Sequence, residues 1–210
     1  LMGIPVKGDG TQTIRITGKP ETGPAEAEII PDRIEAATYL MAGIITKGSV
    51  TVRGIDSGLI DAILLKLEEA GAKIDIMLDE VTAGCKGSLT GIPVKTMPYP
   101  GFPTDTQPQL MAALSLASGT SVIHESHINE FKKMGAKIEL QDSTAIVTGV
   151  AKLTGTEVHA SNLRAGAALI LMGLAAEGVT VVHDLYHVWR GYEGLADKLR
   201  SLGADIELTA

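Results

Sequence analysis

Cysteine, aromatic residues and clustered positive charge are all scarce in this sequence of 210 residues. Cys85 is the only cysteine, which excludes an internal disulfide and fits a reducing compartment such as the cytoplasm. Aromatic residues make up only 3% of the chain. The formal net charge is −7 and no Lys/Arg cluster stands out, so the sequence lacks the basic face that nucleic-acid-binding proteins usually carry.

Long apolar runs, cofactor motifs and metal-ligand patterns are missing as well. The longest apolar run, AGAALILMGLAA, is shorter than the ~18 residues of a membrane span, so no membrane association is expected. No glycine-rich stretch has Walker or Rossmann spacing, which argues against a nucleotide cofactor. His124, His127 and His183 have no metal-ligand spacing with carboxylates or with Cys85, and we expect no metal site.

Hydrophobic and small residues are abundant instead. Hydrophobic residues make up 45% of the chain, glycines number 24, and the mean hydropathy is +0.21. This composition predicts a packed core with tight turns, arranged as one large domain or two small ones.

A repeated pattern organises most of the chain. ITKGSVTV, LASGTSVI and AAEGVTVV each combine a helix end, a glycine and a β-rich run. Each is followed by a second glycine-terminated helix and a further strand, in EAGAKIDI, KMGAKIEL and SLGADIEL. The glycines at these helix ends suit positions that need a positive φ. They are Gly48, Gly71, Gly119, Gly135, Gly178 and Gly203.

The helices within these units have recognisable starts and buried stripes. Asp32 and Asn162 each lie 16 residues before a unit's first glycine (48 − 32 and 178 − 162), and both are good N-caps. Glu35 comes close to completing a capping box with Asp32. Apolar residues spaced for one helix face predict buried stripes in two second helices. They are Ile60, Ile63, Leu64 and Leu67, and then Leu195, Leu199 and Leu202.

The second unit is shorter than the other two. Its two glycines are 16 residues apart (135 − 119), against 23 (71 − 48) and 25 (203 − 178) in the other units. About two helical turns are therefore absent between SVIHES and INEFKKMG. We interpret this as a segment of about seven residues that the protein has but this sequence omits. The alternative is a true deletion from the protein.

Several specific motifs resemble the UDP-N-acetylglucosamine 1-carboxyvinyltransferase family of enolpyruvyl transferases. They are PDRIEAATYL, PYPGFPTDTQPQ, LRAGAALILMGLAAEG and YHVWRGYEGLADKLRSLGADIE, and the resemblance spans essentially the whole chain. It implies an α/β fold, the inside-out α/β barrel domain built from repeated βαβαββ units. Family members have two such domains that close on their substrates, and this chain corresponds to the C-terminal half. The resemblance also places the missing segment between Ser126 and His127.

These units predict a domain organisation. Residues 1–18 are the tail of a preceding repeat or a linker strand, and residues 19–96 form the first unit. Residues 97–153 form the second and residues 154–210 the third, all in one domain of a two-domain enzyme. The family's reactive cysteine and catalytic lysine belong to segments absent from this sequence, and Cys85 in TAGCKGSL does not match that cysteine. We therefore expect the 210-residue half to be inactive alone.

The reaction implied by the resemblance is cell-wall chemistry in the cytoplasm. The enolpyruvyl group of phosphoenolpyruvate is transferred to the 3-hydroxyl of UDP-N-acetylglucosamine, in the first committed step of peptidoglycan synthesis. No cofactor is implied. The partners implied are these two substrates and the missing N-terminal domain. Two alternatives stay open, the related 3-phosphoshikimate enolpyruvyl transferase and a non-catalytic half-domain that serves as a binding module.

Asp105 matches the family acid that contacts the sugar hydroxyl and takes its proton. Four of the twelve residues of PYPGFPTDTQPQ are proline, so the approach to Asp105 is stiff and non-helical. Pro108 fits only in the first turn of the following helix, which puts Asp105 at or beside the N-cap. The alternative to a catalytic role is a capping Asp, and one carboxylate can serve both.

The other site residues follow from the same resemblance. Arg190 in WRGYE matches the arginine that grips phosphoenolpyruvate, with a surface ion pair as the alternative. Arg164 falls in the first turn of a helix whose dipole prefers anions, so its charge is misplaced unless a ligand binds there. Asn162 stands where the family usually has an Asp implicated in addition and elimination, and an Asn cannot take a proton. Ser126 borders the segment that touches the nucleotide sugar, whereas His187 is expected to be packed and hydrogen-bonded.

Overall fold

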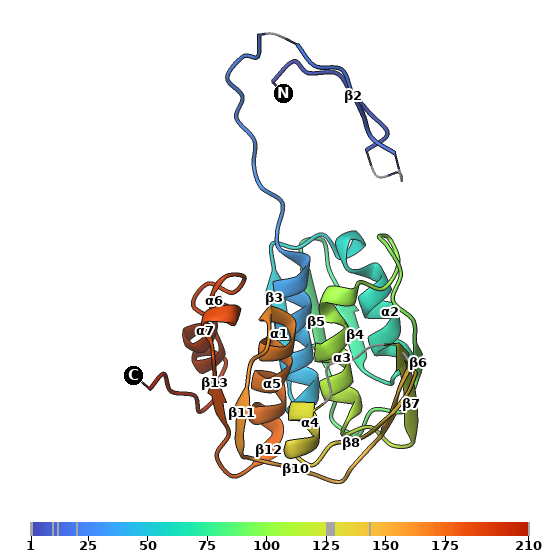
Figure 1. Cartoon of the computed structure of the whole chain (residues 1–210), viewed down its shortest axis with the longest axis vertical. Helices are drawn as coiled ribbons and strands as arrows, with labels where there is room; N and C mark the ends of the chain where they lie inside the picture. Colours follow the sequence, from blue (N-terminus) through green and yellow to red (C-terminus); the bar gives the residue numbers. More distant parts are fainter. Residues whose placement is uncertain are drawn as a thin grey trace. The chain divides into compact units, whose positions relative to one another are not determined.

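The computed structural model describes residues 2–209 except 10, 12, 20, 125–128 and 143, and for His124 its backbone only (Figure 1). Contacts divide the chain into two compact units, Leu1–Pro31 and Asp32–Ala210. In the first unit, strand β1 (Val6–Lys7) pairs antiparallel with β2 (Arg15–Ile16), and the side chains of both strands are exposed. The candidate site lies in the second unit.

Three helices form the centre of the unit Asp32–Ala210. They are α1 (Arg33–Ile45), α3 (Gln107–Leu114) and α5 (Leu163–Ala175), and each packs against the other two. Every residue of α3 is buried, and so is a continuous run in each of the other two helices. A helix that is apolar on all sides belongs in a core.

The predicted N-caps of two central helices are confirmed. The Asp32 side chain accepts hydrogen bonds from the backbone N–H groups of Ile34 (2.8 Å) and Glu35 (3.1 Å). Asn162 Oδ1 accepts one from the Ala165 N–H at 2.9 Å. The predicted capping box is not formed, because the Glu35 carboxylate instead pairs with Lys198.

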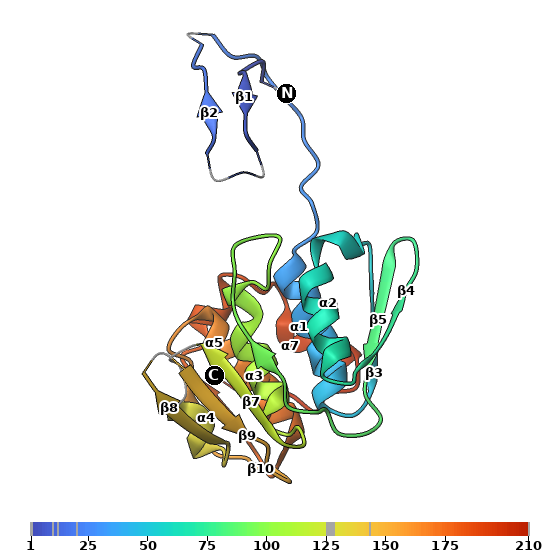
Figure 2. The same ribbon diagram turned by 90° about the vertical axis from the view of Figure 1, so that its right-hand side faces the viewer.

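Two sheets, one antiparallel and one mixed, flank this helical centre (Figure 2). The first has the order β3–β5–β4, and its two outer strands both run antiparallel to β5. Its strands are β3 (Ser49–Arg53), β4 (Lys73–Ile76) and β5 (Glu80–Gly84). A 3₁₀ turn, η1 (Ser57–Leu59), leads into α2 (Asp61–Glu69), which packs on β4. The predicted stripe is confirmed, because Ile60 and three residues of α2 are at most 3% exposed.

The second sheet has the order β6–β7–β9–β8. Its strands are β6 (Pro93–Val94), β7 (Thr120–His124), β8 (Lys137–Gln141) and β9 (Thr144–Thr148). β6 and β7 are parallel and are joined through α3, whereas the other pairs are antiparallel. The predicted break between Ser126 and His127 lies outside the described residues.

Helix α4 (Asn129–Lys133) is short, as the glycine spacing of the second repeat unit (residues 97–153) predicts. Its Glu130 carboxylate accepts hydrogen bonds from Lys133 and from the backbone N–H of His159. Burial alone would raise the pKa of Glu130, but these two hydrogen bonds outweigh it and lower the pKa. The contact with His159 ties α4 to the third unit.

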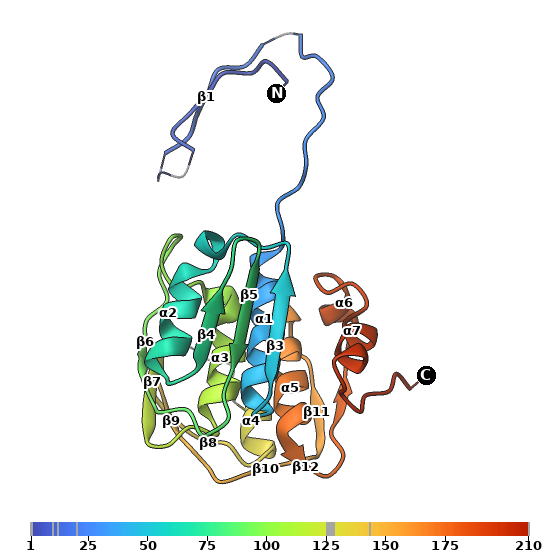
Figure 3. The ribbon, with the colours of Figure 1, turned by 180° about the vertical axis from the view of Figure 1, so that it is seen from behind.

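The third unit consists of short parallel pairs around α5 (Figure 3). β10 (Leu153–Thr154) pairs with β12 (Ala176–Glu177), and β11 (Glu157–His159) pairs with β13 (Val181–His183). Helices α6 (Tyr186–Trp189) and α7 (Leu195–Ser201) follow. The strand expected in ADIEL is not formed, since residues 204–209 have no helix or strand.

Two details of the predicted helix ends are wrong. Leu202 was assigned to a buried stripe but is 51% exposed, because α7 ends at Ser201 and the chain then turns away. Gly48 does not take the positive φ expected after a helix. Lys47 does, at φ 58°, because α1 ends at Ile45. The other glycines of this set do have positive φ.

Candidate functional site

The three central helices run in parallel, so their N-terminal ends lie together. Their C-terminal ends line one hollow of about 580 Å³ at the opposite end, through segments 45–47, 116–119 and 174–177. Figure 1 shows the starts of α1 and α5 at the same end of this unit. The positive ends of three helix dipoles therefore gather in one place, an arrangement that favours anionic ligands.

Asp105 and Arg164 meet at this end. Asp105 belongs to η2 (Thr104–Thr106), a 3₁₀ turn that leads directly into α3, and Arg164 is in the first turn of α5. The guanidinium of Arg164 donates to the carboxylate of Asp105. The two side chains are 53% and 37% exposed, so a ligand can reach this pair.

Asp105 lies beside the N-cap, as expected, but it does not act as a cap. Thr106 occupies the N-cap position of α3, and no side chain caps that helix. Arg164 is not a cap either, because the N-cap of α5 is Asn162. Neither residue of the Asp105–Arg164 pair therefore caps a helix. Arg164 pairs with Asp105 while staying exposed to solvent, so its charge is offset in part by this carboxylate.

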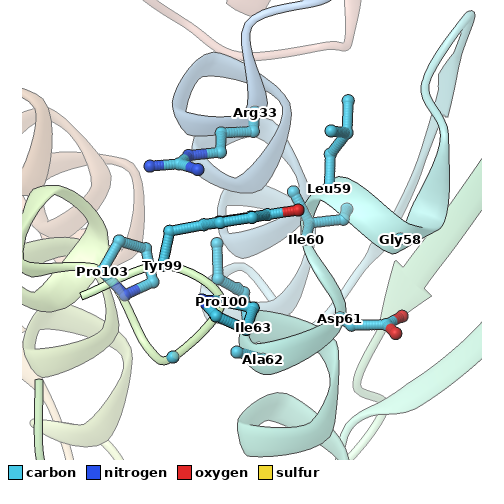
Figure 4. Close-up of a pocket in the computed structure, with 11 residues that line it drawn as sticks. Arg33, Gly58, Leu59, Ile60, Asp61, Ala62, Ile63, Tyr99, Pro100 and Pro103 are labelled. Atoms are coloured by element: carbon cyan, nitrogen blue, oxygen red, sulfur yellow. The ribbon is translucent and has the colours of Figure 1, made fainter. Parts of the chain in front are cut away.

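The proline-rich loop before Asp105 is fastened to two helices. Tyr99 lies beneath the guanidinium of Arg33, which is 5.1 Å from the ring centroid, and above Ile63 (Figure 4). A cation over an aromatic face is an attractive contact. The Met97 N–H donates to the Phe102 carbonyl at 2.8 Å, which closes the loop, and the Phe102 side chain is buried.

A small hollow of about 90 Å³ lies beside this loop, between it and the start of α2. Arg33 and Tyr99 contribute its polar and aromatic wall, and Ile60 contributes apolar surface (Figure 4). The sequence analysis did not single out Arg33 or Tyr99. Arg33 belongs to PDRIEAATYL and Tyr99 to PYPGFPTDTQPQ, and membership in these motifs is the sequence signal that points to them.

Arg190 follows α6 and is held near the start of α5 by close packing. A Cβ on Gly166 would lie 2.4 Å from the Val188 side chain, and one on Gly191 would lie 2.8 Å from Leu163. Only glycine allows α6 and the Arg190 segment to approach α5 this closely. Arg190 itself is exposed.

The side chain of Arg190 is hydrogen-bonded within its own segment. Arg190 Nη2 lies 3.4 Å from His187 Nδ1, and because a guanidinium can only donate, Nδ1 is the acceptor in this contact. His187 also contacts the ring of Tyr186, with centroids 4.1 Å apart. The expectation that His187 is packed and hydrogen-bonded is confirmed.

The predicted site residues are thus brought together only in part. Asp105 and Arg164 touch, and Asn162 caps the helix that carries Arg164. In the described part of the chain, no hydrogen bond or ion pair joins Arg190 to these three residues. Ser126, the remaining predicted residue, lies outside the described residues.

Beneath the site is a buried polar cluster that the sequence analysis missed. It consists of Thr38 on α1, Gln109 on α3 and Tyr192, which follows Arg190 by two residues. Burial raises the pKa of Tyr192, so its hydroxyl keeps its proton. Thr38 and Gln109 are polar residues in apolar helices, but the sequence gives no sign that they meet each other or Tyr192.

The remaining cysteine, histidine and carboxylate side chains of the described residues form no further candidate site. Cys85 is buried, and its thiol donates weakly to the Gly87 carbonyl at 3.4 Å. Over the described ranges, no group of three or more His, Cys, Asp or Glu side chains is arranged to hold a metal ion. No helix in the described part of the chain is long and apolar enough to cross a membrane.

Solved structures place this arrangement among the enolpyruvyl transferases. The enolpyruvyl transferase NikO from Streptomyces tendae superposes with a TM-score of 0.84 and 28% identity, over 98% of this chain and 51% of NikO. EPSP synthase from Acinetobacter baumannii superposes with a TM-score of 0.75 and 17% identity, over 100% of this chain and 53% of that protein, and shows the shared fold. The predicted enolpyruvyl transferase-like α/β fold is confirmed.

The family model for EPSP synthase (3-phosphoshikimate 1-carboxyvinyltransferase) matches residues 1–199, and the chain belongs to this family. Among curated relatives, a protein of Coprothermobacter proteolyticus is 48% identical over 99% of this chain and 51% of its own length. One of Caldanaerobacter subterraneus is 46% identical over 98% and 51%. Both are named UDP-N-acetylglucosamine 1-carboxyvinyltransferase. The chain spans about half the length of the curated relatives it matches.

Proposed function

We propose that the chain is one half of an enzyme that transfers the enolpyruvyl group of phosphoenolpyruvate to the 3-hydroxyl of UDP-N-acetylglucosamine. The observation that carries this proposal is the exposed Asp105–Arg164 pair at the gathered N-terminal helix ends. Relatives that are 45–48% identical and bear the name of this enzyme support the choice of substrates. The reaction serves peptidoglycan synthesis in the cytoplasm and requires no cofactor.

Asp105 is the proposed general base. As the sugar oxygen bonds to C2 of phosphoenolpyruvate, its proton passes to the Asp105 carboxylate, while C3 takes a proton from a general acid and becomes a methyl group. The later loss of phosphate from C2, together with a proton from C3, forms the C=C bond of the enol ether product. A carboxylate paired with Arg164 is fixed in direction, which a base needs. A base must lie ~2.6–3.2 Å from the atom whose proton it takes. The fastened proline-rich loop supplies that fixed position.

Arg190 and Arg164 are the proposed anion-binding groups. Arg190 is exposed, and in the described part of the chain no carboxylate pairs with it, so it can take the carboxylate or phosphate of phosphoenolpyruvate. A planar guanidinium can bind either group through two hydrogen bonds. Asn162 caps α5 and orients Arg164, but it cannot exchange a proton. Ser126 remains a proposed contact to the nucleotide sugar.

A chimeric enzyme tests this proposal. This chain would replace the matching half of the Coprothermobacter relative, which would supply the half that the chain does not span. We expect release of phosphate from phosphoenolpyruvate that depends on UDP-N-acetylglucosamine, and none from the 210-residue chain alone. A well-folded chimera without this activity would refute the proposal.

The acceptor needs its own comparison. The matching family model is described as a 3-phosphoshikimate 1-carboxyvinyltransferase, so shikimate 3-phosphate is the competing acceptor. Titration of each acceptor into the chimera would separate the two. Turnover with shikimate 3-phosphate and none with the nucleotide sugar would transfer the assignment to the shikimate reaction.

A further inference from the structure

One buried hydrogen-bond cluster connects the three repeats of the compact unit. The Tyr192 hydroxyl lies 2.9 Å from Thr38 Oγ1, and Gln109 Nε2 lies 3.3 Å from Thr38 Oγ1 and 3.2 Å from the Tyr192 hydroxyl. Thr38, Gln109 and Tyr192 are 2%, 0% and 3% exposed. Three polar side chains that touch one another inside an apolar core are costly unless nearly every donor is used.

The donors and acceptors of this cluster have one consistent assignment. The Thr38 hydroxyl donates to the Ile34 carbonyl at 2.8 Å, so its single proton is already used. Tyr192 must then donate to Thr38 Oγ1. The two N–H groups of Gln109 donate to Thr38 and to Tyr192. Every donor is satisfied, and Gln109 Oε1 is left without a partner.

Each member of the cluster is rigidly connected to a part of the candidate site. Tyr192 is two residues from Arg190. Gln109 is four residues from Asp105, in the first turn of the α3 helix that continues η2. Thr38 on α1 contacts both Gln109 and Tyr192, and its bond to Ile34 fixes it to the first turns of that helix. The cluster is therefore a polar connection between the segments that carry Arg190 and Asp105.

We propose that the Thr38–Gln109–Tyr192 cluster is a positioning element that fixes Arg190 relative to Asp105. None of the three touches a substrate, since all are buried. They act through the backbone segments that carry Arg190 and Asp105. The inference deepens the function proposed above and rests on it for its kinetic consequence, but its structural consequence can be measured in this chain alone.

Hydrogen exchange in the 210-residue chain tests the structural part. Tyr192→Phe removes the donor to Thr38 and leaves the ring in place. We expect amides in residues 186–192 to exchange roughly fivefold faster, the effect of one lost buried hydrogen bond on local opening. Amides of the β3–β5–β4 sheet should be unchanged. Equal acceleration throughout the unit, or none at 186–192, would overturn the inference.

Tyr39→Phe is the matched control. Tyr39 follows Thr38 on α1 and is also buried, but its hydroxyl takes no part in the hydrogen bonds that join Thr38, Gln109 and Tyr192. Burial and, secondarily, the charge of nearby Glu35 raise its pKa, so it too loses a neutral hydroxyl on mutation. Exchange at 186–192 should stay as in the unmodified chain. Faster exchange in this control would mean that any lost buried hydroxyl loosens the segment, and would refute a specific role of the cluster.

Kinetics of the chimera test the functional part. Thr38→Val deletes the shared acceptor, whereas Thr38→Ser retains it. A displaced Arg190 should raise KM for phosphoenolpyruvate about tenfold or more, because small misplacements of a binding group are costly. KM for the nucleotide sugar should hardly change, and Thr38→Ser should restore both constants. Equal effects of Val and Ser, or unchanged constants in folded Thr38→Val enzyme, would overturn the inference. An inactive unmodified chimera would refute the proposed function instead, and the exchange experiment would then decide this inference.

Discussion

Asp105→Asn separates a catalytic carboxylate from a structural one. The substitution keeps the shape of the side chain and one oxygen that can accept a hydrogen bond from Arg164, but it removes the charge and the ability to take a proton. In the structure Asp105 caps no helix, so no capping energy is at stake. The substitution removes from the folded state only the Asp105–Arg164 ion pair, whose side chains are 37% and 53% exposed.

The two expected magnitudes are well separated. A solvent-exposed ion pair contributes at most about 1 kcal/mol, so the free energy of unfolding of the 210-residue chain should fall by less than that. The loss of a positioned general base lowers the rate about 10²-fold or more, which corresponds to roughly 2.7 kcal/mol in the activation free energy. Turnover should therefore respond far more strongly than stability.

Urea denaturation of the chain and phosphate release by the chimera supply the two measurements. Asp61→Asn is the control, because Asp61 also stands in the first turn of a helix but lies outside the proposed catalytic groups. It should leave kcat unchanged. The reasoning about Asp105 is refuted if Asp105→Asn lowers the free energy of unfolding by 2 kcal/mol or more while kcat of the folded chimera stays normal.

Three further substitutions have defined outcomes. Arg190→Lys in the chimera should raise KM for phosphoenolpyruvate by an amount worth roughly 1.5–3 kcal/mol, with the nucleotide-sugar KM little changed, and unchanged kinetics would make Arg190 a surface cation. Gly166→Ala places a methyl group 2.4 Å from Val188, so the chain should lose about 1–2 kcal/mol in urea denaturation despite the better helix propensity of alanine; equal or greater stability would refute this close contact. Glu130 has a lowered pKa, so its contacts stabilise the fold fully above the ordinary value of 4.5 and lose this effect as pH falls through the lower folded value. The Tm difference between the unmodified chain and Glu130→Gln should therefore be largest near neutral pH and shrink below pH 4.5, and a constant difference would contradict the assignment.

Local patterns predicted the regular elements well because the forces involved are local. A side-chain oxygen two or three residues before a free N–H defines a helix start, which is why Asp32 and Asn162 could be assigned from sequence. The apolar spacing from Ile60 to Leu67 likewise predicted a face that the structure buries. The strand expected after Gly203 failed because a strand needs a partner, and local composition does not supply one.

The site was harder to predict because it depends on contacts between distant segments. Residue type and motif identified Asp105 and Arg164 separately, but their pairing across 59 positions follows only from the packing of α3 on α5. The same holds for Thr38 and Tyr192, which are 154 positions apart. A buried threonine in an apolar helix carries no sequence signal of its partner, so the cluster beneath the site could be found only in three dimensions.

The mutual burial of α1, α3 and α5 also determines how the protein unfolds. In a solenoid, each repeat contacts only its neighbours, and terminal repeats can fray while the others persist. Here each central helix packs on both of the others, so the departure of one exposes apolar surface on two. The repeats of the unit Asp32–Ala210 therefore cannot melt one at a time. Although the sequence was built by repetition, the global unfolding of this unit is that of a single all-or-none body.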